Sequence, residues 1–214
     1  MDEGRIIIVA GHYGAGKTNV AVSLALKSAE RGVAVIDLDT VNPYFRAADS
    51  ASVLRAAGVR TIIPEYANSN VDIPTLPPDI ASVFSSDELA IFDVGGDDGA
   101  SALGVYERDI RSAGYEMLYV TNMYRPLTAT PEDAVAVMRE IESYSRLNFT
   151  GIVNNSNIGA ETTRDAVEMS AAYAESISRL TGLPVVFTSV IGEDAAPRGT
   201  GRVLVMDNHT KKLF

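Results

Sequence analysis

The chain has 214 residues, of which 46% are apolar and 21% charged, enough for one α/β domain with a substantial core but not for two. It contains no cysteine and two histidines, which excludes disulfides, thiolate metal sites, a cysteine nucleophile and a histidine-rich metal cluster. Its formal net charge of −10 argues against non-specific binding to DNA or to an anionic membrane. The short acidic start does not resemble a signal peptide and no apolar run could span a bilayer, so we expect a cytoplasmic protein.

The first chemical motif is a glycine-rich loop between a strand and a helix. Residues 6–10 are apolar and predict a β-strand, and a helical pattern follows Thr18. Between them, residues 11–18 read G-x-x-x-x-G-K-T, which is the Walker A phosphate loop in the context that this motif requires. The alternative is a chance match to the motif, and the flanking strand and helix disfavour it. We therefore predict that this segment binds a nucleotide.

Each residue type in this loop has a physical role. Glycines at three positions let the backbone turn its N–H groups inward and form a nest for phosphate oxygens at a helix N-terminus. Lys17 is predicted to reach the β- and γ-phosphates, and the Thr18 hydroxyl is predicted to ligate Mg²⁺. The predicted nucleotide-binding residues of this segment are Gly11, His12, Tyr13, Gly14, Ala15, Gly16, Lys17, Thr18 and Asn19.

Strands and helices alternate along the rest of the chain. The patterns predict further strands over residues 33–37, 60–63, 89–94, 117–121, 149–154, 185–188 and 203–206. They predict helices from Val20, over 45–57, around 103–110, from the N-cap Thr130, and over about 161–180. The alternation indicates an α/β fold: a doubly wound, mostly parallel sheet of seven or eight strands with helices on both faces. We expect one domain over residues 1–214. The proline-rich stretch 64–78 is either a surface loop or a functional one.

Two acids follow the second predicted strand. Asp37 and Asp39 alternate where this strand leaves the sheet, so they would lie beside the phosphate loop if the two strands are neighbours. They could also be a turn residue and a helix cap. Beside a phosphate loop we favour metal and water chemistry, and we predict Asp39 as a catalytic residue and a metal ligand.

The fourth predicted strand ends in another acid. Apolar residues 90–92 precede Asp93, which is the Walker B pattern of a carboxylate that holds Mg²⁺, usually through water. Gly96 could bring a backbone N–H close to the γ-phosphate. Asp97 and Asp98 would repel that phosphate unless they face away or bind metal, so they receive no role. The predicted Mg²⁺ ligands are therefore Thr18, Asp39 and Asp93.

Together, the phosphate loop, the D-x-D strand end and the Asp93-x-x-Gly96 loop resemble the MinD/ParA/CobQ/CobB group of P-loop ATPases. The resemblance implies binding of ATP or ADP with Mg²⁺, phosphoryl transfer supported by Lys17, and a water molecule oriented by Asp39. In that group an Asn at the tip of a later strand recognises adenine. The segment Gly151–Asn155 matches it, and Asn155 fits better than Asn154 when counted from the glycine. Either could instead be a strand-ending turn residue.

The sequence departs from that group at one position. Many members, the partition ATPases especially, carry a second lysine after the first glycine, and this lysine crosses a dimer interface. Here the position is His12, followed by Tyr13 where a glycine is usual. The metabolic branch, with the dethiobiotin and cobyrinate enzymes, also lacks this lysine. A homodimer is one possible assembly, but it would lack the lysine that crosses the interface in the partition ATPases. Nitrogenase iron proteins and complete cobyrinate amidotransferases are excluded because both need cysteine.

Three functions remain open from the sequence. The first is an ATPase that acts as a nucleotide-dependent switch on a protein partner, through loops 39–46 and 95–99. The second is a metabolic enzyme that phosphorylates a carboxylate of a small-molecule substrate. The third is a protein that binds nucleotide without turning it over. Tyr44, Phe45 and Arg46 could form either a partner surface or a substrate pocket, and we expect no DNA or membrane partner.

Overall fold

The computed structural model describes residues 5–38, 51–62, 79–199 and 201–208, apart from the side chains of residues 79 and 97. Several predictions fall outside this part of the chain. They concern Asp39, the residues 44–46 that could contact a partner, the first half of the helix predicted over 45–57, and the stretch 64–78. Their roles stay predictions.

The described strands form one eight-stranded sheet in the order β3-β2-β4-β1-β5-β6-β7-β8. All neighbouring strands are parallel, which confirms the predicted sheet and its upper strand number. A single domain over 1–214 stays a prediction. The strands are β1 (Ile6–Gly11), β2 (Val33–Asp37), β3 (Arg60–Ile62), β4 (Leu89–Gly95), β5 (Tyr115–Thr121), β6 (Gly151–Asn154), β7 (Val185–Ile191) and β8 (Val203–Met206).

The helices agree with the sequence patterns with three differences. They are α1 (Lys17–Lys27), α2 (Ala51–Ala56), α3 (Asp79–Ser85), α4 (Gly96–Gly104), α5 (Glu107–Ala113), α6 (Pro131–Ser145), α7 (Arg164–Met169) and α8 (Ala171–Thr181). Helix α3 was not predicted. The helix expected around 103–110 is two helices, α4 and α5, and the helix expected over 161–180 is divided at Ser170 into α7 and α8. Thr130 caps α6 as predicted, since its hydroxyl accepts a hydrogen bond from the Asp133 N–H.

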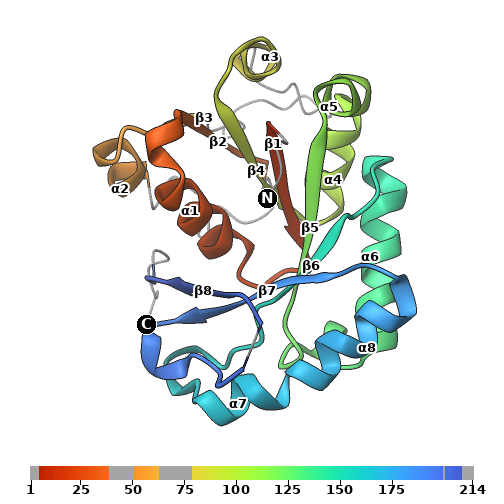
Figure 1. Cartoon of the computed structure of the whole chain (residues 1–214). Helices are drawn as coiled ribbons and strands as arrows, with labels where there is room; N and C mark the ends of the chain where they lie inside the picture. Colours follow the sequence, from red (N-terminus) through yellow and green to blue (C-terminus); the bar gives the residue numbers. More distant parts are fainter. Residues whose placement is uncertain (1–4, 39–50, 63–78, 200, 209–214) are drawn as a thin grey trace, which may run out of the picture.

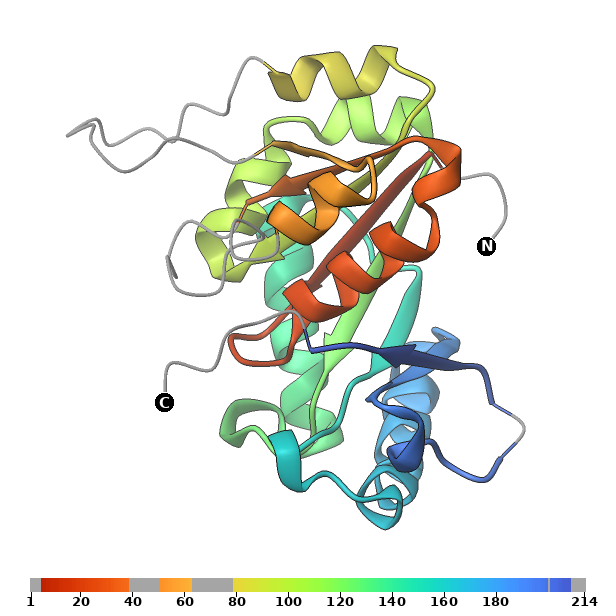
Figure 2. The same ribbon diagram turned by 90° about the vertical axis from the view of Figure 1, so that its left-hand side faces the viewer.

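The two faces of the sheet are both buried, as a doubly wound fold requires. Alternate residues of β1 point to opposite sides: Ile6 and Ile8 join the core under α3, α4, α5, α6 and α8, whereas Ile7 and Val9 join the core under α1 and α2. Figure 1 shows α1 and α2 on one side of the strands and α4 and α6 on the other. In Figure 2 α1 and α2 lie in front of the sheet. None of the described helices is long and apolar enough to cross a bilayer.

The order of the strands makes the end of β1 a topological switch point of the sheet. The helix that follows β1 packs on one face of the sheet, and the helix that follows its neighbour β4 packs on the other. In parallel α/β sheets, ligands bind outside the carboxyl ends of strands at such a switch point. The loop after Gly11 and the loop after Gly95 therefore meet at one edge, because these two residues are in register.

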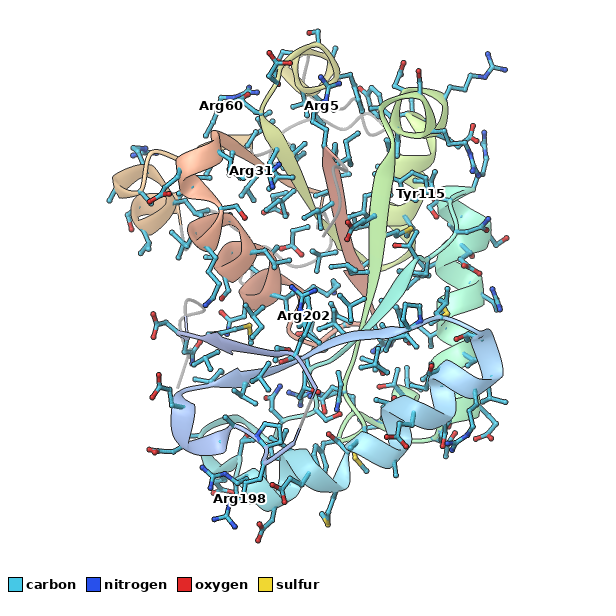
Figure 3. All side chains as sticks on the ribbon, in the orientation of Figure 1. Arg5, Arg31, Arg60, Tyr115, Arg198 and Arg202 are labelled. Carbon is cyan, nitrogen blue, oxygen red and sulfur yellow. The ribbon has the colours of Figure 1, made fainter. Side chains whose placement is uncertain are left out.

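Arginines at the opposite, amino edge of the sheet have structural partners. Figure 3 labels Arg5, just before β1, and Arg60, at the start of β3. The Arg5 guanidinium donates to the carbonyl of Phe84 at 2.7 Å, which fixes the end of α3. Arg60 forms an ion pair with Glu88 at 2.6 Å, and the hydrogen bond from Arg60 lowers the pKa of Glu88 although burial opposes it. These cations stabilise the edge that faces away from the phosphate loop.

Candidate functional site

The loop between β1 and α1 has backbone angles that favour glycine at two of its positions. Gly14 and Gly16 have φ angles of +73° and +87°, a region that favours glycine. A Cβ on Gly11 would lie 2.2 Å from the carbonyl oxygen of Val120 in β5, so a side chain would push the loop off the sheet. The glycines of the motif are therefore required by the backbone itself.

A backbone N–H and the lysine ammonium of the loop, both of which the motif assigns to phosphate binding, donate to the same carbonyl oxygen. The carbonyl oxygen of His12 accepts a hydrogen bond from the Ala15 N–H at 3.1 Å and another from the Lys17 ammonium at 3.3 Å. Lys17 is almost fully buried, with 5% of its surface exposed. Because a phosphate oxygen is a stronger acceptor than a peptide carbonyl, both donors suit an anion at this place.

The predicted Walker residues Thr18 and Asp93 contact each other directly. The Thr18 hydroxyl donates to Oδ2 of Asp93 at 2.6 Å, and both side chains are buried. The contact exists because β4 lies next to β1, which brings Asp93 level with Val9. A hydroxyl and a carboxylate oxygen beside a phosphate loop are the donor set that Mg²⁺ prefers, so these two residues fit the metal that the motif implies.

Of the two acids in the D-x-D strand end, the structure describes only the first, Asp37. Asp37 is buried at the end of β2 and in register with Asp93 of β4. The second strand therefore neighbours the Walker B strand, but it does not neighbour the strand of the phosphate loop, because β4 lies between β2 and β1. Asp39 lies outside the described residues. Within the described part of the chain, no three acidic or histidine side chains gather into a metal site. Asp39 as a metal ligand and as the residue that orients water stays a prediction.

The two candidate adenine-reading amides have different surroundings. Asn154 donates to the Ser170 hydroxyl at 2.8 Å and accepts from the Ser156 N–H at 3.3 Å, so it holds the junction between α7 and α8. Asn155 donates to the carbonyl of Ala15 at 2.6 Å and accepts from the Ser189 hydroxyl at 2.9 Å. Only Asn155 contacts the phosphate loop. Recognition of adenine by either residue stays a prediction.

The last residue of the predicted binding segment lies at the side of the loop that faces the C-terminal strand. Asn19 is buried in the first turn of α1, and its side-chain amide donates to Asn208, two residues after β8, at 3.5 Å. The helix therefore contacts both the centre of the sheet and its far edge.

Arg125 is a residue of this site that sequence reasoning missed. It follows β5, and its Nε donates to the carbonyl of Gly14 at 2.9 Å across 111 positions of sequence. A lone arginine in a turn matches no motif, so no local pattern identifies it. The structure therefore supplies the phosphate loop with a second cation besides Lys17.

The turn that carries Arg125 is held by a buried polar network. The Thr128 hydroxyl donates to the Asn122 carbonyl at 2.8 Å, and the Tyr173 hydroxyl donates to the Thr128 carbonyl at 2.6 Å. Since Tyr173 has a single hydroxyl hydrogen, the Thr121 hydroxyl donates to the Tyr173 oxygen, also at 2.6 Å. Burial raises the pKa of Tyr173, so its hydroxyl remains protonated and its bonds persist at neutral pH.

Two adjoining cavities border the first half of the loop. A cavity of about 490 Å³ is lined by Gly11, His12, Tyr13, Lys17, Gly96, Asp98, Leu127, Val137, Glu140 and Ile141. A second, of about 330 Å³, is lined by His12, Tyr13, Gly14, Arg125, Pro126 and Leu127. The lining residues show that one cavity contains Lys17 and the other Arg125, while both share His12, Tyr13 and Leu127. Gly96, predicted to lie near the γ-phosphate, does line the Lys17 cavity.

Comparison with protein families and curated sequences gives a partial match. The Zeta toxin family model matches residues 3–71, which is less than half of the chain but includes the whole phosphate loop. No curated protein sequence matches the chain. These results support a P-loop protein, and they leave the resemblance to the MinD/ParA/CobQ/CobB group as a prediction.

Solved structures show the fold more completely. The cell division protein FtsY of Thermotoga maritima aligns at a TM-score of 0.62 and 20% identity, covering 91% of this chain and 65% of that chain. The chloroplast FtsY of Physcomitrella patens aligns at 0.55 and 16% identity, with coverages of 89% and 59%. The FtsY of Elizabethkingia anophelis, solved with GDP, aligns at 0.54 and 18% identity, with coverages of 91% and 59%. This chain spans less than two thirds of each structure's length. At these identities the likeness concerns the fold alone: the chain has the α/β fold of P-loop NTPases.

Proposed function

We propose that this protein binds Mg·ATP at the carboxyl edge of its sheet and hydrolyses it, as a nucleotide-dependent switch for a protein partner. The observation that carries the proposal is the contact between the Thr18 hydroxyl and Asp93 beside the buried Lys17. In P-loop enzymes these three residue types bind Mg²⁺ and the β- and γ-phosphates together. They come together from the start of α1 and from β4.

In the proposed reaction a water oxygen forms a bond to the γ-phosphorus while the bond to the bridging oxygen breaks. The products are ADP, inorganic phosphate and a proton that leaves to solvent. Lys17 and the loop N–H groups stabilise charge on the transferred group, and Asp39 orients the attacking water. Mg²⁺, when bound near Thr18 and Asp93, would neutralise charge on the phosphate oxygens.

The choice of ATP over GTP rests on the resemblance of the three motifs to ATPases. A side-chain amide has one acceptor and two donors, which suits the amino group and a ring nitrogen of adenine, and this is the proposed role of Asn155 or Asn154. One structural neighbour was solved with GDP, so the base must be tested directly. Competition of ATP, GTP, ADP and GDP for one fluorescent nucleotide analogue decides it.

A second candidate function is supported by the 490 Å³ cavity. It adjoins Lys17 and Gly96, has an apolar wall from α6 and contains Asp98 and Glu140. The enzyme hypothesis requires room for a small-molecule acceptor beside the phosphates, and this cavity supplies it, although Asp98 and Glu140 would repel an acceptor that is itself a carboxylate.

Turnover assays separate the two candidates. The switch predicts slow release of phosphate from Mg·ATP with no other substrate, and faster release only with a protein partner. The enzyme predicts ADP formation only when a small acceptor is added. Absence of any nucleotide binding by the purified chain, measured by calorimetry with ATP and GTP, would contradict both.

A further inference from the structure

The geometry points to Arg125 as a second phosphate-binding cation, which contacts the terminal phosphate of the bound nucleotide while its Nε stays on the Gly14 carbonyl. This inference rests on the proposed function, since it concerns the same nucleotide. It assigns a γ-phosphate contact to a residue outside every recognised motif of the chain.

The guanidinium of Arg125 lies against the phosphate loop. Its Nε is bound to the Gly14 carbonyl at 2.9 Å, and Nε and Cδ are the heavy atoms nearest to a Cβ placed on Gly14. The side chain therefore lies against the loop instead of extending into solvent. The turn below it is fixed by bonds between Asn122 and Asn157, with distances of 3.0 and 3.2 Å. This anchoring lowers the conformational entropy that a flexible arginine would lose on binding.

Most N–H donors of the Arg125 guanidinium are not used by its bond to the Gly14 carbonyl. A guanidinium has five N–H donors, and Nε supplies one of them. Among the described residues, no carboxylate forms an ion pair with Arg125, unlike Arg60, Arg111 and Arg139. Four donors on the two terminal nitrogens thus suit a bidentate contact with a phosphate. In a chain with a net charge of −10, a cation that forms no ion pair within the described part of the chain favours an anionic ligand.

Arg125 and Lys17 border the same part of the phosphate loop. The loop amides cradle the inner phosphates, and the motif lysine reaches the β- and γ-phosphates. Lys17 points to the carbonyl of His12, and Arg125 to the carbonyl of Gly14, so the two cations border the same segment of three residues. Among the residues that the structure describes, no acidic side chain lines the cavity that contains Arg125. A γ-phosphate bound over His12–Gly14 would have one of these cations at each end of the segment.

The test separates charge from loop support by comparing two substitutions. In Arg125→Gln the amide nitrogen occupies the same place along the side chain as Nε, so the donor to Gly14 is kept while the terminal nitrogens are lost. We expect ATP affinity to fall about tenfold, and ADP affinity to change less than about twofold, because ADP lacks the γ-phosphate. Arg125→Ala should lose ATP affinity and, through the freed loop, some ADP affinity too. Arg139→Ala, an exposed arginine of α6 outside both cavities, is the control.

The measurement is calorimetric titration of the full chain with Mg·ATP and Mg·ADP, with a thermal melt of each variant. Equal losses of ATP and ADP in Arg125→Gln would show that Arg125 only supports the loop and would overturn the inference. Unchanged ATP affinity in that variant would overturn it as well. If the wild-type chain binds neither nucleotide, the proposed function itself fails, which is a distinct result.

Discussion

The side-chain amide of Asn155 donates a hydrogen bond of 2.6 Å to the main-chain carbonyl of Ala15 across 140 positions of sequence. The contact is close enough that a Cβ on Gly16 would lie 2.2 Å from the amide nitrogen. In a planar peptide the carbonyl and the following N–H point in opposite directions. Holding the carbonyl of Ala15 therefore sets the direction of the Gly16 N–H, one of the donors of the phosphate nest.

Substitution of Asn155 tests this contact. We expect Asn155→Ala to weaken GTP and inorganic tripolyphosphate by similar factors of about five to thirty, since the loop loses a support that every phosphate ligand needs, and to weaken ATP more than GTP, as the proposed reading of adenine requires. Titration with the three ligands measures it. Asn154→Ala is the matched control, because that amide bonds to Ser170 and not to the loop. A loss confined to ATP, with tripolyphosphate unchanged, would instead assign Asn155 to the recognition of adenine alone.

Lys17→Ala should remove most of the affinity for ATP while the fold stays intact. The ammonium is the loop's own cation, and the hydrogen bond that it makes, at 3.3 Å to the His12 carbonyl, is long and contributes little to stability. Calorimetry with Mg·ATP and a circular dichroism melt check the two halves of the expectation. ATP affinity within about threefold of wild type would contradict the role of Lys17.

Thr18→Ala should affect both stability and metal dependence. It removes a 2.6 Å donor to the buried Asp93 carboxylate, which costs about 1–3 kcal/mol, and it removes a proposed Mg²⁺ ligand. We expect ATP affinity in the variant to respond much less to added Mg²⁺ than in the wild type. Thr18→Ser keeps the hydroxyl and is the control. If Mg²⁺ enhances ATP binding equally in the alanine variant and the wild type, Thr18 is not a metal ligand.

Asp39→Ala should separate binding from chemistry. A residue that orients the attacking water acts mainly in the transition state, so the variant should bind Mg·ATP within about threefold of the wild type yet release no phosphate above background. Phosphate release under single-turnover conditions, with affinity from titration, measures the two properties. Hydrolysis at the parental rate would place the water-orienting group elsewhere.

The effect of ATP on assembly follows from the residue after the first glycine of the loop. His12 stands where the partition ATPases have the lysine that neutralises phosphate across a dimer interface, and an acidic chain adds repulsion. We expect ATP to leave the oligomeric state of Asp39→Ala unchanged in sedimentation. Proteolysis should show that ATP alters the accessibility of loop 39–46. Conversion of monomer to dimer by ATP, abolished by His12→Ala, would restore a partition-type switch.

The sequence alone determined the features that depend on neighbours in the chain. The phosphate loop, the Thr130 cap of α6 and the alternation of strands and helices were all identified because backbone preferences and hydrophobic periodicity act over a few residues. The Walker B role of Asp93 was also predicted from the sequence. The reason is that Asp93 ends an apolar strand, and this strand follows the phosphate loop along the chain. Its contact with Thr18 confirms the adjacency of the two strands.

Only the tertiary structure decided which distant side chains contact the loop. Arg125 reaches Gly14, and Asn155 rather than Asn154 reaches Ala15, because β5 and β6 follow β1 in the sheet and their end loops lie beside it. The break between α7 and α8 also involves a distant side chain, because the Ser170 hydroxyl at this break accepts a hydrogen bond from the amide of Asn154. Each of these contacts joins a side chain to groups far along the chain, so its geometry depends on strand order and depth, which no local pattern encodes.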